Sequence, residues 1–169
     1  DGVREYLGIP FAKPPVGELR WKAPEPADPW EGTLDATKPG PDCAQQIGGD
    51  SDGSLSENCL YLNVYTPDAE TKDLPVVVFI HGGGYTAGTP NIYDGSRMAE
   101  TGDAVVGVPA YRLGFFGFFS SEGTAAEGEY GTSGNWGILD QPQALRWVQE
   151  NITAFGGDPN NDTIVGESA

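Results

Sequence analysis

Residues 74–84, LPVVVFIHGGG, decide the fold class of this chain. The first seven residues form a continuous apolar run, which is the pattern of a central strand covered on both faces of a parallel sheet. His81-Gly82-Gly83-Gly84 follows at once and predicts a loop at the end of that strand. Consecutive glycines let a backbone approach another group closely and adopt positive φ, although three glycines by themselves also fit a flexible turn.

Further strands and helices are predicted on either side of this stretch. Strand patterns occur at three places, residues 59–65, 104–108 and 163–165. Residues 96–102 fit a short helix, and residues 135–155 repeat apolar side chains at the helical period. Because Pro142 is tolerated only near a helix start, the regular part of the second helix is expected from about Asp140. The first 50 residues are rich in proline and predict extended loop with at most short edge strands. The alternation predicts an α/β fold with a mostly parallel central sheet and flanking helices.

Ser168 is the candidate nucleophile. It stands in Gly166-Glu167-Ser168-Ala169, directly after a predicted strand. Gly-x-Ser at the end of a strand is the first half of a nucleophile elbow, but alone it also fits an ordinary turn. Combined with the earlier strand and glycine loop, in this order, it matches sites in which both segments supply backbone amides to an oxyanion. The pair predicts acyl-transfer chemistry.

Several segments carry longer signatures, in the order Tyr6–Ala12, Glu57–Val64, Tyr111–Gly114, Gly134–Gly137, Leu139–Gln141, Phe155–Asn160 and Gly166–Ala169. Together they resemble the type-B carboxylesterase/cholinesterase family along nearly the whole chain. The resemblance implies that residues 1–169 are the amino-terminal part of an α/β-hydrolase domain, cut off at the nucleophile elbow, with the remainder after Ala169. Asn58 stands where the family usually has Asp, and Asp162 and Pro109 replace residues typical of strands.

The resemblance also assigns roles to single residues. Ser168 would attack the ester, and the backbone N–H groups of Gly83, Gly84 and Ala169 would form the oxyanion hole. Glu167 would line the acyl pocket beside the serine through ordered water. The implied activity is hydrolysis of small carboxylic esters through an acyl-serine intermediate, with no cofactor.

The only histidine of the chain is His81, in the glycine loop. A serine hydroxyl needs a base, and His81 is a poor candidate because no orienting acid follows it. In the family the acid and the His follow the serine, so we expect both beyond Ala169 and expect this chain alone to be inactive. Two alternatives are a non-catalytic adhesion or scaffold protein on the same fold, and an inert truncated product. The intact Ser168 and glycine loop favour the enzyme.

Three covalent or ionic contacts are implied by the same resemblance: a disulfide Cys43–Cys59 and the ion pairs Arg20–Glu57 and Arg112–Asp140. The alternative for the cysteines is two free thiols, which a reducing cytoplasm would maintain. The location is therefore left open between extracellular and cytoplasmic, and a disulfide favours the former. The loop between the cysteines contains no Trp, which argues against choline esters, since a Trp there would meet the quaternary ammonium group.

Charge and composition exclude several other classes. Nine Lys and Arg against 25 Asp and Glu give a formal net charge of −16, which disfavours nucleic acid and anionic membranes as partners. The acidity fits either a well-solvated surface or adaptation to high salt. The apolar run at residues 76–80 is far shorter than the roughly 20 residues that span a bilayer, and residues 113–119 are expected to form core and pocket wall. One His and two Cys cannot build a metal site. Nothing in the sequence indicates an oligomeric state.

Overall fold

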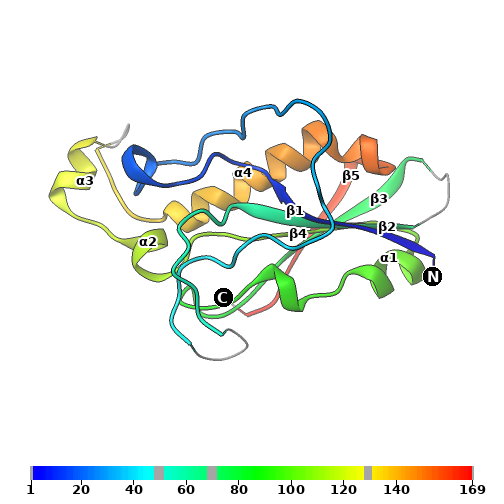
Figure 1. Ribbon diagram of the computed structural model, residues 1–169, viewed down its shortest axis with the longest axis horizontal. Coiled ribbons are helices and arrows are strands. Elements are labelled where there is room, and N and C mark those ends of the chain that lie inside the picture. The colour runs from blue at the N-terminus through cyan, green and yellow to red at the C-terminus, as the bar shows by residue number, and fades with distance from the viewer. Residues whose placement is uncertain (1, 48–51, 68–71, 128–130, 169) are drawn as a thin grey trace.

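The strand predicted at residues 74–80 lies inside a mixed sheet. The computed structural model describes residues 2–47, 52–67, 72–127 and 131–168. Within these ranges the chain has one five-stranded sheet, with its strands in the order β1-β2-β4-β3-β5. The strands are β1 Val3–Pro10, β2 Tyr61–Pro67, β3 Leu74–Ile80, β4 Val105–Pro109 and β5 Gly157–Gly166. Strand β2 is antiparallel to both neighbours, whereas β3 is parallel to β4 and β5. Every strand except β2 therefore runs in the same direction (Figure 1), as the mostly parallel prediction requires.

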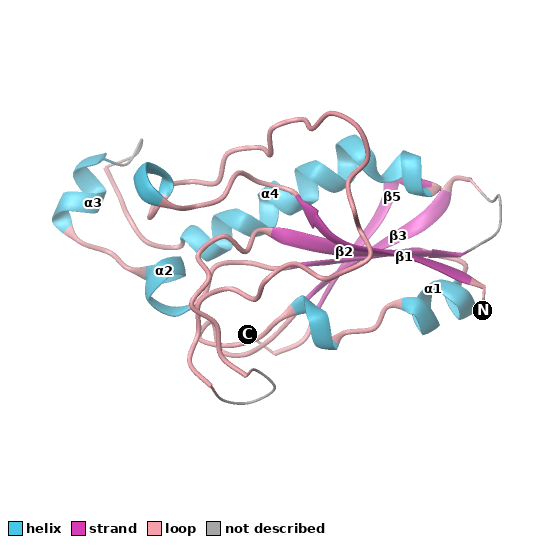
Figure 2. Cartoon of the chain, in the orientation of Figure 1, coloured by secondary structure: helices cyan, strands magenta, loops and turns pink. Residues whose placement is uncertain are grey.

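Helices cover both faces of this sheet (Figure 2). The α-helices are α1 Ser96–Gly102, α2 Gly114–Phe118, α3 Glu122–Glu127 and α4 Trp136–Asn151, and short 3₁₀ turns are η1 Gly17–Leu19, η2 Pro90–Ile92 and η3 Ile152–Phe155. Val76 and Val78 pack with Trp147 of α4 in the larger apolar cluster. The smaller cluster contains Ala99 of α1 and Val106. The result is a three-layer arrangement.

Strand β1 is longer than the prolines suggested. The expectation of at most short edge strands is wrong here, because β1 runs for eight residues along the edge of the sheet. Only Pro10 lies inside it, at its end. A register shift between Tyr6 and Ile9 surrounds Gly8, whose φ is 70° and whose amide donates to Asn63 Oδ1 at 3.0 Å. The edge position and the bulge accommodate a segment that breaks the regular ladder.

Helix α4 begins at Trp136, four residues before the expected start near Asp140. Pro142 therefore lies in the helix interior, where it lacks the N–H that would continue the hydrogen bonding. Tertiary contacts hold the first turn in place: Arg112 Nη2 donates to Trp136 O at 3.4 Å, and its guanidinium binds the carboxylate of Asp140. Pro142 itself is exposed. The predicted helix start rested on local helix propensity alone, which takes no account of hydrogen bonds from another segment.

Strand β5 extends over ten residues rather than the three predicted at 163–165. Leu74 pairs with Gly157, then the register shifts, and regular pairing with β3 resumes at Asp162. The carboxylate of Asp162 accepts a hydrogen bond from Gln149 Nε2 of α4 at 2.9 Å. Asp162 is exposed, so its charge remains in water at a strand position that is usually apolar.

The implied disulfide is present between Cys43 and Cys59. Both cysteines are buried, and the loop that they close lies beside the glycine turn after β3. With a sequence separation of 16 residues, the cross-link is expected to stabilise the fold by about 3 kcal/mol, because it restricts the unfolded chain.

We expect the Cys43→Ser/Cys59→Ser variant of the full-length protein to lose about 3 kcal/mol of unfolding free energy. Urea unfolding followed by circular dichroism measures this loss. Reduction of the parent protein with dithiothreitol should produce the same shift, which controls for the serine side chains. Equal midpoints for the oxidised parent and the double variant would show that the cross-link contributes nothing.

The two implied ion pairs are also present, but they differ in burial. Arg112 and Asp140 form a bidentate pair at 2.7 and 2.8 Å, with side chains only 3% and 0% exposed. Arg20 Nη2 donates to Glu57 Oε1 at 2.6 Å, with side chains 39% and 18% exposed. Only the Arg112–Asp140 pair is therefore buried inside the protein.

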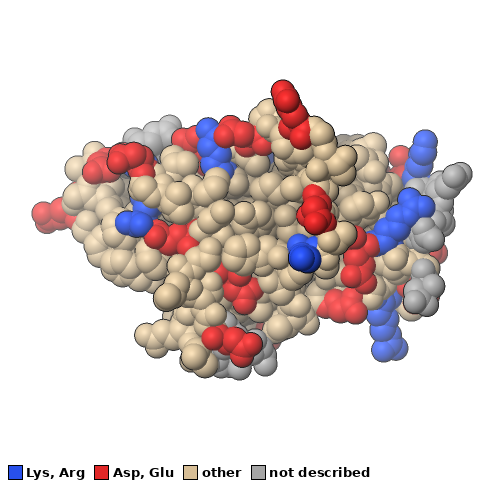
Figure 3. Space-filling view, in the orientation of Figure 1, with Lys and Arg blue, Asp and Glu red and all other residues tan. Residues whose placement is uncertain are grey.

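In the view of Figure 3, carboxylates are scattered over a mainly uncharged surface, with basic side chains among them. Within the described ranges, every helix is too short or too polar to cross a bilayer.

The Phe-rich segment at residues 113–119 forms α2 and its ends, a helix that the sequence did not predict. Leu113 in this segment is buried, whereas Phe115 is 57% exposed.

Candidate functional site

The glycine loop and the Ser168 segment leave the sheet side by side. Strands β3 and β5 are parallel neighbours, with Ile80 opposite Gly166, and the amide of Glu167 donates to the carbonyl of Ile80 at 3.2 Å. The residues after each strand therefore start from the same edge of the sheet. This is the arrangement in which open α/β sheets place their ligands, beyond the carboxyl ends of parallel strands.

Gly82 contacts the serine segment directly. A Cβ added at Gly82 would lie 2.5 Å from Glu167 Oε2 and 2.8 Å from Ser168 Cβ. Atoms at these distances overlap, so any side chain at Gly82 would push the two segments apart. By contrast, a Cβ at Gly166 would meet only Ile80 O, at 3.9 Å, among the described residues. The close approach at this point therefore depends on Gly82.

Ser168 adopts a backbone conformation that is uncommon for a residue with a side chain. Its φ is 57°, in the left-handed region, and its side chain is exposed. Such a conformation costs on the order of 1–2 kcal/mol for an L-residue. A sharp turn directly after a strand is the geometry by which a nucleophile elbow presents a serine hydroxyl above the sheet.

The glycine loop closes into a tight turn through one carbonyl. Gly83 O accepts hydrogen bonds from the amides of Thr86 and Ala87, both at 3.1 Å, and from Thr86 Oγ1 at 3.2 Å. Gly83 and Gly84 have φ values of 121° and 61°, and a Cβ at Gly83 would overlap the carbonyl oxygen of Ala87. Within the described parts of the chain, neither the Gly83 nor the Gly84 amide donates a hydrogen bond. Both glycines are exposed, so solvent can reach these amides.

Ala169, the third amide assigned from the sequence, lies outside the described residues. The structure therefore brings Ser168, Glu167 and the Gly82–Gly84 turn together and does not place the amide of Ala169.

His81 has a structural role in this turn. It is 2% exposed, stacks on Tyr111 with ring centroids 4.4 Å apart, and lies 2.8 Å through Nδ1 from the carbonyl of Gly82. Since a carbonyl only accepts, Nδ1 carries the proton. Tyr111 Oη donates to His81 O at 2.8 Å. Burial lowers the pKa of His81, so the ring is neutral and fixed in the wall of the site.

Glu167 is held next to Tyr93, a residue that sequence reasoning did not single out. Tyr93 Oη donates to Glu167 Oε2 at 3.4 Å, and the Tyr93 ring packs on Phe79 of β3 at 4.7 Å. The tyrosine comes from the segment after η2, and its spacing from the serine gives no signal in the sequence.

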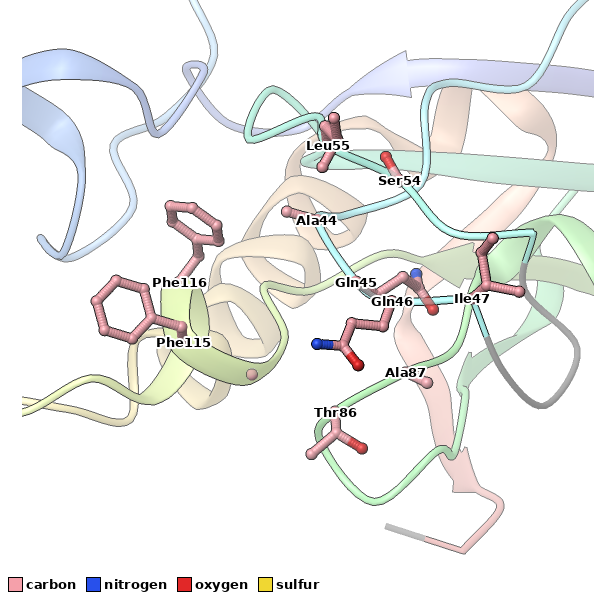
Figure 4. Close-up of a pocket in the computed structure, with 11 residues that line it drawn as sticks. Ala44, Gln45, Gln46, Ile47, Ser54, Leu55, Thr86, Ala87, Phe115 and Phe116 are labelled. Atoms are coloured by element: carbon pink, nitrogen blue, oxygen red, sulfur yellow. The ribbon is translucent and has the colours of Figure 1, made fainter.

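A cavity of about 640 Å³ opens beside the glycine turn (Figure 4). It lies between the loop closed by the disulfide, the turn and helix α2, and its walls are Ala44, Gln45, Gln46, Ile47, Ser54, Leu55, Thr86, Ala87, Gly114, Phe115 and Phe116. Phe115 and Phe116 bear out the expectation that the Phe-rich segment forms a pocket wall. Gln45 bonds directly to Gly88, at the end of the turn. No group of three potential metal ligands occurs in the described ranges.

The parallel strand pair, the elbow-like serine and the adjacent glycine turn are those of an α/β-hydrolase fold. Comparison with known proteins agrees, because the model of the carboxylesterase family matches residues 1–169. The chain belongs to the carboxylesterase family.

Two curated relatives are pyrethroid hydrolase Ces2e of Rattus norvegicus, 50% identical over 100% of this chain, and para-nitrobenzyl esterase of Bacillus subtilis (strain 168), 49% identical over 100% of this chain. The chain spans 31% and 35% of these relatives, about a third of their length. Among solved structures, a PNB esterase is 50% identical over 99% of this chain and 35% of its own, with a TM-score of 0.88, and EstA of Aspergillus niger is 40% identical over 98% and 32%, with a TM-score of 0.86.

Proposed function

We propose that the full-length protein carrying this chain hydrolyses carboxylic esters, with Ser168 as the nucleophile. The contact of Gly82 with Glu167 and Ser168 carries this proposal, because it brings the serine and the glycine turn to one point. The Ser168 hydroxyl attacks the ester carbonyl and the alcohol leaves. An acyl-serine remains, which water then cleaves to the acid and free enzyme.

The amides of Gly83 and Gly84 are proposed to hold the oxyanion of the tetrahedral intermediate. Two features support them: no described residue accepts their hydrogens, and their positive φ values turn the backbone within a tight loop. Donors fixed before the reaction need no reorganisation as charge develops, and each is worth on the order of 10²–10³ in rate. We assign Ala169 N–H as the third donor from the family resemblance.

The base that removes the Ser168 proton is proposed to lie in residues after Ala169. His81 is not placed to supply it, because its ring is 2% exposed, stacked on Tyr111 and held through Nδ1 by the carbonyl of Gly82. The chain by itself is accordingly expected to be inactive. Glu167 is proposed to line the acyl pocket, where the Tyr93 hydroxyl orients its carboxylate.

A non-catalytic scaffold on the same fold is the competing function. It gives no reason for a strained backbone at Ser168 or for amides without acceptors in the neighbouring turn. The strained backbone at Ser168 costs stability and is typical of functional sites.

Turnover of a chromogenic short-chain ester by the full-length protein tests the proposal. A fluorophosphonate, which reacts with activated serines, should abolish turnover and add its mass to the tryptic peptide that contains Ser168. Heat-denatured protein is the labelling control. Absence of turnover, or a label on another serine, would overturn the assignment.

A further inference from the structure

We infer that Gln45 is a positioning residue for ester hydrolysis, because it clamps the end of the glycine turn at Gly88. The inference rests on the proposed function and adds a residue that lies outside the serine and glycine segments. Gln45 belongs to the loop closed by the disulfide and lies 43 residues from Gly88. It therefore connects two segments whose relative position no local sequence pattern specifies.

The side-chain amide of Gln45 binds both backbone groups of Gly88. Gly88 N donates to Gln45 Oε1 at 2.9 Å, and Gln45 Nε2 donates to Gly88 O at 2.8 Å. The second hydrogen of Nε2 goes to Cys43 O at 3.0 Å. The Gln45 side-chain amide therefore has one donor beside its oxygen and two acceptors beside its nitrogen. If the amide were flipped, Oε1 would face the carbonyl oxygens of Gly88 and Cys43, so these partners fix its orientation.

Gln45 is itself held rigidly. Its backbone N–H and C=O exchange hydrogen bonds with Ser54 at 2.9 and 3.0 Å, across the loop. Ser54 Oγ donates to Asp42 O at 2.6 Å, and Cys43 is linked to Cys59. A side chain whose own backbone is fixed in this way transmits its position to the groups that it binds.

Gly88 in turn packs against the start of the glycine loop. Its φ is 121°, and a Cβ added there would lie 2.5 Å from His81 Nδ1 and would overlap Gly82 O. The preceding residue, Ala87, donates its amide to Gly83 O. A displacement of Gly88 would therefore shift both His81-Gly82 and the carbonyl that orients Gly83.

Loss of the clamp is expected to reduce kcat more than it changes KM. Oxyanion donors must lie within about 2.7–3.1 Å of the oxygen that becomes charged, and a misplacement of about 1 Å can cost 10²-fold in rate. Through Gly88, Gln45 controls the direction of the Gly83 and Gly84 amides. Its loss should therefore weaken the binding of the transition state more than the binding of the substrate. We expect kcat to fall by roughly 10- to 10²-fold with KM within about threefold.

The Gln45→Glu variant of the full-length enzyme tests this through pH. As a carboxylate the new side chain cannot donate to Gly88 O, whereas the protonated acid can donate to that carbonyl and accept from Gly88 N. The ratio of variant to parent kcat should therefore be low at pH 8 and rise severalfold as pH falls toward 5. Gln141→Glu adds the same charge in helix α4, at a residue that does not line the cavity, and should show no such rise.

The outcomes separate this inference from the proposed function. If the parent hydrolyses no ester, the proposed function fails; if the parent is active and the Gln45→Glu ratio is flat between pH 8 and 5, only the clamp fails. Should Gln45→Glu not fold, Gln45→Met keeps a similar length without hydrogen bonding. A lowered kcat with unchanged KM then supports the clamp, and a parental kcat overturns it.

Discussion

Ser168→Ala is expected to lower the kcat of the full-length enzyme for a chromogenic ester by about 10⁶, the effect of removing the serine in other hydrolases that use this chemistry. The left-handed turn at Ser168 and the contact with Gly82 place its Cβ beside the glycine turn, and the proposed mechanism gives no other group the role of nucleophile. KM should change little, because the hydroxyl contributes to reaction rather than to binding. Steady-state kinetics with purified protein measures both values.

Two matched variants make this result specific. Ser133→Ala removes a half-buried hydroxyl that binds Ser120 and Ser121 far from the glycine turn in sequence, and its kcat should match the parent. Far-ultraviolet circular dichroism of Ser168→Ala should match the parent as well. Retained turnover in folded Ser168→Ala protein would contradict the role given to this serine.

Asp140→Ala is expected to cost about 3–5 kcal/mol of unfolding free energy, because it leaves Arg112 charged and buried without its partner. The Arg112 guanidinium donates two hydrogen bonds to Asp140 and its backbone amide donates a third, at 2.9 Å. Arginine cannot lose its proton at ordinary pH, so the stranded charge has no means of neutralisation. Urea unfolding at pH 7 measures the loss.

The partner substitution and the half-buried pair provide the comparison. Arg112→Met should cost less, since burial already raises the pKa of Asp140 and the unpaired carboxyl can take up a proton. Glu57→Ala should cost less still, because Arg20 is 39% exposed and water can solvate it. Equal losses for Asp140→Ala and Glu57→Ala would contradict the account of burial given above.

Much of the fold could be predicted because the apolar runs are unambiguous. Strand β3 and helix α1 have the predicted bounds. For β3 the reason is that a strand inside a sheet needs apolar residues on both faces, and nothing competes with that pattern. The failures arise where a tertiary contact outweighs local preference. Helix α4 starts early because Arg112 bonds to Trp136 and Asp140, and β1 persists beside several prolines because its neighbour β2 supplies the ladder.

The residues of the candidate site also divide into those that the sequence reveals and those that it does not. The glycines could be recognised because few other residues permit positive φ and close approach of the backbone, and Ser168 because it stands in a Gly-x-Ser motif directly after a strand. Gln45 and Tyr93 could not, because each acts through a single contact between distant segments: Gln45 with Gly88, and Tyr93 with Glu167. Neither contact imposes a spacing or a composition on the sequence.

The most direct test of the central claim is a crystal structure of the full-length protein after reaction with a fluorophosphonate. The phosphonyl oxygen on the serine adduct takes the place of the oxyanion. We expect phosphorus bonded to Ser168 Oγ, with this oxygen within about 2.7–3.1 Å of the amide nitrogens of Gly83 and Gly84. A phosphonyl oxygen directed into solvent, with both glycine amides remote from it, would contradict the account.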